Sequence, residues 1–215
     1  MKKALIIAII AVFATSVAIA QEAYDVKETW QKTITVPASQ ASTIEKLFTA
    51  WGQEFPGAYV NAFNKFKKTG KADKIEIFEG VEMDFNVDFA PKDGYLEING
   101  VQVFSFTDGD YTEEIERAHI LQAVYWSLPN GNKLFGVSIK DDGEVFPECA
   151  LALYEYDSAK GTLTPRPKIV QKVMDVINDD EDTFLMLPKE GRDLHYIDYL
   201  DDGKLKTIKW TGNGF

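Results

Sequence analysis

The 215-residue chain carries 34 acidic and 23 basic side chains, a formal charge of −11, and 45% of its residues are hydrophobic. This is enough apolar material for one buried core or two small ones. Its acidic surface repels nucleic-acid phosphates, so we expect no nucleic-acid partner, and the same charge disfavours binding to anionic membranes.

The first twenty residues have the layout of a cleaved secretory signal. Two lysines precede an apolar run over residues 4–13, and small residues stand at Ala18 and Ala20. The run is shorter than the roughly 20 apolar residues that a membrane-spanning helix needs. We therefore expect residues 1–20 to be a signal peptide that is removed.

The chain beyond the signal, residues 21–215, begins with Gln21, and no cysteine lies near it. A lipid-anchored export signal needs a cysteine there to acylate, so no lipid anchor is expected. No later apolar run reaches spanning length, which predicts no membrane insertion after cleavage. The short, lysine-bearing signal is of bacterial type and predicts a periplasmic or extracellular protein. Cys149 is the only cysteine, which excludes an internal disulfide, and its apolar surroundings favour a buried thiol.

Residues 21–72 are expected to form a helical part. Ser42 and Glu45 fit a capping box, in which side chains satisfy the free amides of a helix start. Apolar residues then recur at helical spacing, namely Ile44, Leu47, Phe48 and Trp51. A second helix is predicted to end at Gly70. Its apolar residues are Tyr59, Val60, Phe63 and Phe66.

Residues 73–215 are expected to be β-rich, because the hydrophobic period changes from near four to two. Apolar and polar residues alternate strictly over 81–89, the pattern of a half-buried strand. Asn130-Gly131 between two apolar runs predicts a hairpin. A further strand is expected over 95–101, and residues 101–106 extend it or begin another. More strands are expected over 123–128, 133–140, 146–156, 183–187, 194–200 and 205–210.

Two further helices are predicted within the β-rich part. Acidic residues at first-turn positions favour a short helix from Thr112 to about Ile120, after the loop at Asp108-Gly109-Asp110. Apolar residues at mixed spacing favour another helix over 168–177.

The predicted fold is therefore α+β: two N-terminal helices packed on a mostly antiparallel, meandering β-sheet, in a single domain. A strongly curved sheet wrapped around a helix is the architectural alternative. It would enclose a cavity that Leu47, Phe48 and Trp51 could line.

The acidic residues of the alternating strand are the sharpest chemical pattern. Glu82, Asp84 and Asp88 lie on one strand face, and acids two residues apart are about 6.5–7 Å apart along a strand. Inverting glycosidases hold two carboxyl groups about 6.5–9.5 Å apart. A solvated sheet face has the same pattern, so this spacing supports a carboxylate-dependent hydrolase only as an alternative.

No residue is predicted to be catalytic, to ligate a metal or to bind a cofactor. Glu116 and His119 have the Glu-x-x-His spacing of a di-metal site, but such a site needs two pairs on bundle helices. The acidic loops starting at Asp108 and Asn178 both fail the EF-hand spacing, which leaves loose calcium binding open. The chain also lacks a nucleophile elbow and a dinucleotide fingerprint, which favours a non-enzymatic protein.

Aromatic residues are the candidate binding residues, because several fall in predicted strands. On one open sheet face they could stack on sugar rings or grip a protein partner, and they could equally fill a core. The candidates are Tyr125, Trp126, Tyr154, Tyr156, Tyr196, Tyr199 and Trp210.

Five segments between Ile120 and Phe215 carry a resemblance to a known group of proteins. They are 123–126, 130–135, 154–157, 161–165 and 210–215, with the sequences AVYW, NGNKLF, YEYD, GTLTP and WTGNGF. The C-terminal half that they cover resembles uncharacterised exported proteins of gut-type Gram-negative bacteria. The resemblance implies an antiparallel, β-rich exported fold and assigns no activity and no site residue.

The sequence therefore predicts an exported, non-enzymatic protein that binds a macromolecule or a glycan through a sheet face. The alternatives from other classes are a small carboxylate-dependent hydrolase and a structural or assembly protein.

Overall fold

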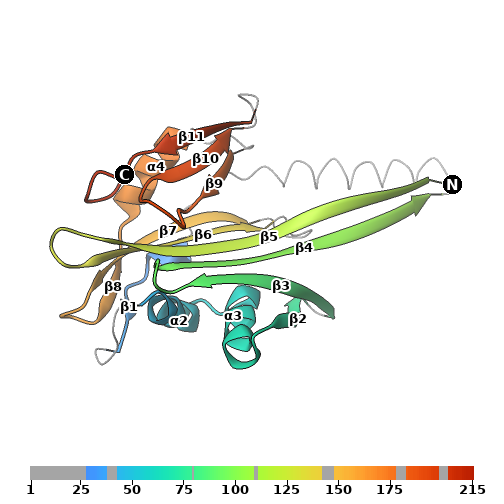
Figure 1. Ribbon diagram of the computed structural model, residues 1–215, viewed down its shortest axis with the longest axis horizontal. Coiled ribbons are helices and arrows are strands. Elements are labelled where there is room, and N and C mark those ends of the chain that lie inside the picture. The colour runs from blue at the N-terminus through green and yellow to red at the C-terminus, as the bar shows by residue number, and fades with distance from the viewer. Residues whose placement is uncertain are drawn as a thin grey trace.

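The computed structural model describes residues 28–37, 43–78, 80–108, 111–141, 148–177, 183–198 and 203–215. Three layers make up the fold (Figure 1): a helical layer, a large sheet, and a layer of one helix and a small sheet. The expected signal peptide and the residues around Gln21 lie outside the described residues.

The large sheet has eight strands in the order β1-β8-β7-β6-β5-β4-β3-β2, and every neighbouring pair is antiparallel. The expected α+β class is thus observed, with strands predominating. The strand bounds are β1 Ile34–Thr35, β2 Ala72–Phe78, β3 Val81–Ala90, β4 Tyr95–Asp108, β5 Tyr111–Ser127, β6 Lys133–Asp141, β7 Glu148–Asp157 and β8 Thr162–Pro165.

The helical layer covers one face of this sheet. It contains a short 3-10 helix, η1 (Glu28–Gln31), and two α-helices, α2 (Ile44–Glu54) and α3 (Ala58–Thr69). Helix α3 ends at Gly70, whose φ of 75° is a left-handed conformation that glycine adopts without strain. The start of α2 differs from the predicted capping box, because Thr43 is its N-cap residue and makes no side-chain cap; Ser42 lies outside the described residues.

The opposite face of the sheet carries α4 (Pro167–Ile177) and a three-stranded sheet in the order β11-β10-β9. The small sheet consists of β9 (Thr183–Met186), β10 (Leu194–Asp198) and β11 (Lys204–Ile208). The last three strands predicted from the sequence therefore form a separate sheet. None of the described helices is long and apolar enough to cross a membrane.

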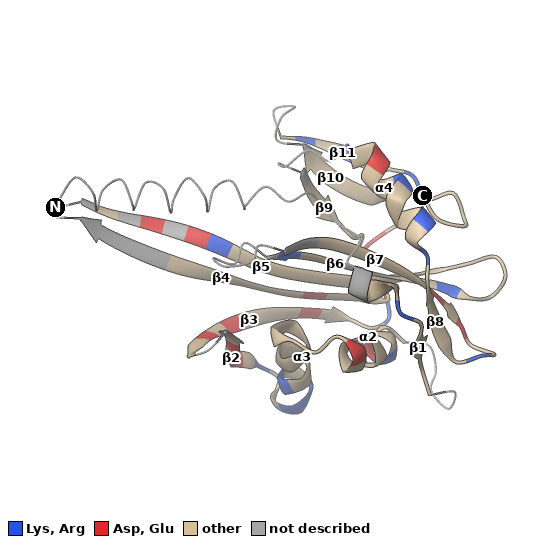
Figure 2. Cartoon of the chain, turned by 180° about the vertical axis from the view of Figure 1, so that it is seen from behind, with Lys and Arg blue, Asp and Glu red and all other residues tan. Residues whose placement is uncertain are grey.

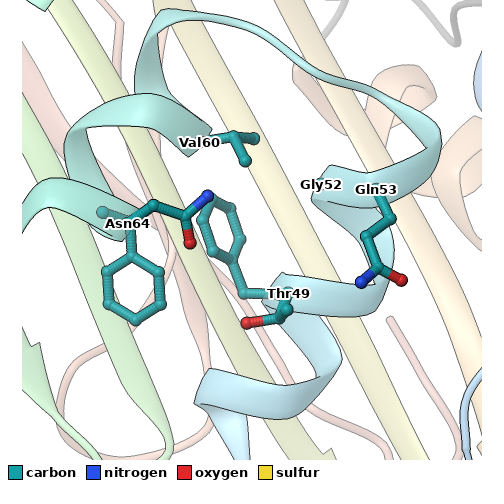
Figure 3. A pocket seen from close by; sticks show the side chains of 7 residues that line it. Thr49, Gly52, Gln53, Val60 and Asn64 are labelled. Atoms are coloured by element: carbon teal, nitrogen blue, oxygen red, sulfur yellow. The ribbon is translucent and has the colours of Figure 1, made fainter. Parts of the chain in front are cut away.

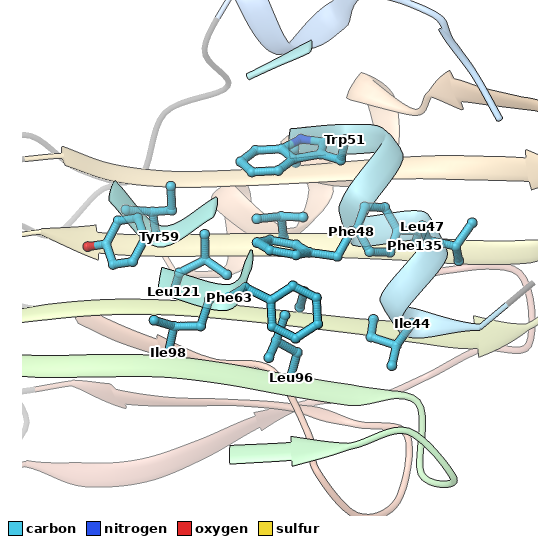
Figure 4. Packing of buried hydrophobic residues seen from close by; sticks show 14 of the residues in the cluster. Ile44, Leu47, Phe48, Trp51, Tyr59, Phe63, Leu96, Ile98, Leu121 and Phe135 are labelled. Atoms are coloured by element: carbon cyan, nitrogen blue, oxygen red, sulfur yellow. The ribbon is translucent and has the colours of Figure 1, made fainter. Parts of the chain in front are cut away.

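The helix-side core lies between α2, α3 and the large sheet (Figure 4). Phe48 and Phe63 meet edge to face with ring centroids 5.3 Å apart, and both are at most 1% exposed. They pack above strand residues such as Leu96 and Leu121. Full burial of side chains this large is worth about 1.5–3 kcal/mol each, so this contact fastens the helices to the sheet.

A second core lies on the other face, between the large sheet, α4 and the small sheet. Trp126 stacks on Trp210 at 5.7 Å, and Phe215 packs edge-on against both rings. The Trp126 Nε1–H donates to the carbonyl oxygen of Arg192 at 2.9 Å. The centre of the large sheet is therefore buried on both faces.

The prediction of a short helix from Thr112 to about Ile120 is wrong, because this segment belongs to β5. Its residues pair antiparallel with β4, from Thr107↔Thr112 to Asn99↔Ile120. The acidic residues that suggest a first helical turn have only weak intrinsic preferences. A continuous ladder to the neighbouring strand outweighs them.

Candidate interaction surface

The aromatic candidates are divided between the two cores. Four are buried, namely Trp126, Tyr154, Tyr156 and Tyr196. Tyr125 and Trp210 are half-buried and pack against different cores, and Tyr199 lies outside the described residues. Successive strand residues point to opposite faces, so the neighbours Tyr125 and Trp126 separate in this way. The described candidates form no common exposed patch.

The acidic residues of β3 all lie in solvent. Glu82, Asp84 and Asp88 are each exposed. The Asp84 carboxylate accepts the backbone N–H of Lys74 at 2.7 Å, and Asp88 pairs with Lys189. A general acid for hydrolysis needs a carboxyl group whose pKa is raised by an enclosed site. Three solvent-exposed carboxylates on one strand do not form such an enclosed site.

Glu116 and His119, the pair with the spacing of metal ligands, also lie apart from each other. His119 is 4% exposed, whereas Glu116 is exposed three residues away on the same strand. Because the two differ by an odd number of residues on β5, they belong to opposite faces. Among the described residues, no group of three histidine, cysteine or acidic side chains is arranged to hold a metal ion.

A polar network that the sequence analysis missed joins the two sheets. Gln122 accepts the backbone N–H of Leu187 at 2.9 Å and donates to Glu97 at 2.8 Å. Glu97 also accepts from the Tyr95 hydroxyl at 2.6 Å and from Asn99 at 2.6 Å. Burial, reinforced by the Glu97 carboxylate, raises the pKa of Tyr95. Through Gln122 and Leu187 the network links the large sheet to the segment that follows β9. Its members hydrogen-bond to one another, so its position is better suited to fastening the layers than to holding a ligand.

A pocket of about 200 Å³ opens between α2 and α3 (Figure 3). Its lining residues are Phe48, Thr49, Gly52, Gln53, Val60, Phe63 and Asn64. A Cβ atom at Gly52 would lie 2.8 Å from both methyl groups of Val60, so Gly52 allows the helices to approach closely. Ligand pockets usually measure about 300–1,000 Å³. This space suits a group no larger than about one side chain.

A two-stranded arm is the most prominent surface feature (Figure 1). We define the arm as residues 101–108 of β4 and 111–118 of β5, which pair with each other from Val101↔Ala118 to Asp108↔Tyr111. The pairing of β3 with β4 ends at Asn99, and that of β6 with β5 ends at His119. In the part of the chain that the structure describes, neither outer edge of the arm has a neighbouring strand.

Among the described strands, the outer edge of β4 has no neighbour beyond Asn99, because β3 turns away beneath it. A Cβ atom at Gly100 would lie 2.9 Å from Cε of Met83 and 3.0 Å from the carbonyl oxygen of Asp84. Met83 belongs to the helix-side core. Strand β3 therefore passes under Gly100 towards the helical layer, and β4 continues outward alone with β5.

The two strands of the arm differ in charge. The β4 segment Val101–Thr107, with the sequence VQVFSFT, has no ionisable side chain. On β5, Glu114 and Glu116 are exposed. Figure 2 shows acidic residues in red on the arm segment of β5. Val101 and Val103 are 57% and 52% exposed, which makes them two of the four exposed large hydrophobic residues among those described.

The sequence offered two signals for the arm, namely the strand expected over 101–106 and the turn that follows it. Asp108-Gly109-Asp110 is a turn sequence between two segments of similar length, which is compatible with a hairpin. The acidic residues after it favour a helix instead, and this local pattern hid the arm.

No family model, no curated protein and no solved structure matches this chain. A functional argument therefore depends on the chain's own residues.

Proposed function

We propose that this is an exported, non-enzymatic interaction protein that binds an extended polypeptide by strand addition to the β4 edge of the arm. One observation carries the proposal: among the residues that the structure describes, the outer edge of Val101–Thr107, opposite the edge paired with β5, has no neighbouring strand. The segment has no charged residue and displays two exposed valines. In strand addition, main-chain hydrogen bonds supply affinity, and the side chains flanking the edge supply selectivity.

Export is the second part of the proposal. Its support is the signal layout of residues 1–20, which leaves residues 21–215 as one domain in the periplasm or outside the cell. Gln21 at the expected cut gives a mature chain without a lipid anchor.

A polypeptide partner is favoured over a glycan because of what the surface displays. Sugar stacking needs accessible aromatic faces, and Trp126, Tyr154, Tyr156 and Tyr196 are buried. A free strand edge displays backbone N–H and C=O groups, which match the backbone of another chain.

Natural proteins commonly protect an exposed edge with charged side chains. The β5 strand of the arm has such residues in Glu114 and Glu116, whereas the β4 segment has none. The difference between two strands of the same arm supports β4 as the binding edge.

A strand-forming peptide probe tests this function. The probe is fluorescein-labelled Lys-Thr-Val-Thr-Val-Thr-Lys, and the control is Lys-Thr-Pro-Thr-Pro-Thr-Lys, which has the same charge but lacks two N–H donors. Titration with dilute mature protein should raise the fluorescence anisotropy of the valine probe and leave that of the proline control unchanged. Val103→Lys should weaken probe binding at least tenfold, whereas Val176→Lys, at a valine 50% exposed on α4, should leave it unchanged. Equal binding of both peptides, or equal effects of both variants, would overturn the proposal.

A further inference from the structure

We infer that the chain added to the β4 edge is a second copy of this protein, so that two arms form one four-stranded sheet in the order β5-β4-β4-β5. This inference depends on the proposed function, because it names the partner of the same edge. A two-fold axis perpendicular to the sheet would relate the two copies, with β4 antiparallel to β4.

The β4 segment is complementary to itself. In a two-fold pairing centred on Phe104, each residue of Val101–Thr107 lies opposite another residue of the same uncharged set. Val103 would lie opposite Ser105 of the second copy, and the two Val103 residues would be diagonal neighbours on one face. Diagonal residues are about 7–8 Å apart, close enough for the exposed valines of both copies to form one apolar cluster.

The β5 edge fails the same test. A two-fold pairing of β5 with β5 centred on Ile115 places Glu114 opposite Glu116 of the second copy on one face, and this repulsion offsets the attraction between Glu113 and Arg117 on the other face. Moving the centre to Glu114 or Glu116 places that glutamate opposite itself. Like charges directly opposite each other destabilise a strand pair, so the two edges are not equivalent.

The position of β3 limits the overlap of the two arms. Strand β3 occupies the β4 edge as far as Asn99, so an added strand can pair only from about Val101 outward. A pairing over Val101–Thr107 uses this free length and stops before β3. Seven residues of strand span about 23 Å. The two bodies then lie at opposite ends of the shared sheet, farther apart than the Debye length of about 8 Å at physiological salt. This limits repulsion between two mature chains, each of charge −13, which is the −11 of the full chain without the two lysines of residues 1–20.

The charge difference between the β4 and β5 strands of the arm also limits the assembly to two copies. The outer edges of the four-stranded sheet would be the two β5 strands, each with the exposed glutamates Glu114 and Glu116. Charged edges resist further strand addition. The structure thus favours a closed dimer over an open filament.

Sedimentation equilibrium of the mature chain over a range of concentrations tests the dimer. The expected result is a monomer–dimer equilibrium without larger species. The double variant Val101→Lys/Val103→Lys should lower the association constant at least tenfold, because it places lysines of both copies near one another. The matched double variant Val176→Lys/Leu205→Lys changes two other exposed residues and should leave the constant unchanged. Circular dichroism checks that each variant folds.

Hydrogen exchange locates the contact independently. Among residues 101–107, the alternate amides that point away from β5 should exchange more slowly as protein concentration rises, while the amides of residues 111–118 should not. A dimer that the arm variant leaves intact, or an open series of oligomers, would overturn the inference. A chain that stays monomeric yet binds the strand probe overturns the dimer and leaves the proposed function standing. A chain that does neither overturns both.

Discussion

Gly100 lies so close to Asp84 that a Cβ atom at Gly100 would be 3.0 Å from the Asp84 carbonyl oxygen. Glycine within a strand often marks the close approach of another backbone. Here the approach is the crossing of β3 beneath β4, the point at which the sheet narrows to the arm.

Gly100→Ala should therefore lower the free energy of unfolding by about 1–3 kcal/mol, since the backbone of β3 must shift to admit the methyl group. Urea unfolding measures the change. Gly57→Ala is the matched control, because Gly57 has an extended φ of 174° and nothing within 4 Å of the added atom. The control should cost less than about 1 kcal/mol. Equal losses in both variants would contradict the crossing.

Gly52→Ala tests the contact between α2 and α3 beside the pocket. The added methyl group would lie 2.8 Å from both Val60 methyl groups, so we expect a loss of about 1–3 kcal/mol. Replacing Val60 by Ala removes those methyl groups and should make Gly52→Ala less costly. A double-mutant cycle of urea unfolding measures this coupling. Strictly additive effects would show that the two residues do not constrain each other.

Gln122→Leu tests the polar network between the sheets. The variant leaves the buried N–H of Leu187 without its acceptor and removes a donor from Glu97. We expect a loss of about 1–3 kcal/mol in the free energy of unfolding. Gln171→Leu is the control, because Gln171 is exposed on α4 and bonds to Asp175 one turn away. If both variants unfold alike, the network adds nothing to the docking of the small sheet.

Glu155 should give stability a measurable pH dependence. Hydrogen bonds from Asn132 and Asn130, with the charge of Arg166, lower the pKa of its carboxyl group in the folded protein. The resulting stability is present above the unfolded pKa of about 4.3 and is lost as pH falls through the lowered folded value. Glu155→Gln should therefore destabilise the protein by about 1 kcal/mol at pH 7, and the difference from wild type should shrink at pH 3. A difference that is constant between pH 7 and pH 3 in urea unfolding would contradict this assignment.

Several elements follow directly from local sequence. The alternation over 81–89 becomes β3, and the expected helix over 168–177 becomes α4. The first depends on a period of two that the segment displays by itself, whereas the second is expected from apolar residues at mixed spacing within the segment. The error at residues 112–120 has the opposite origin, because the strand exists through its pairing with β4.

The candidate site was harder to predict for a similar reason. A period of two shows that strand residues alternate, but it does not reveal which face another layer will cover. The second core buries Trp126 and Tyr196 because α4 and the small sheet fold back over the large sheet. The exposed outer edge of β4 begins where β3 stops pairing with it, at Asn99. A single glycine at position 100 is not enough to predict that point from the sequence.

The arm and the core are made of the same two strands. Strand β5 runs without interruption from the arm into the middle of the large sheet, where β4 and β6 flank it on either side. A pull on the arm along its axis would load the ladders on both sides of β5 in shear, with many hydrogen bonds bearing the force together. The arm is therefore anchored mechanically by the two hydrogen-bond ladders that hold β5 in the middle of the large sheet.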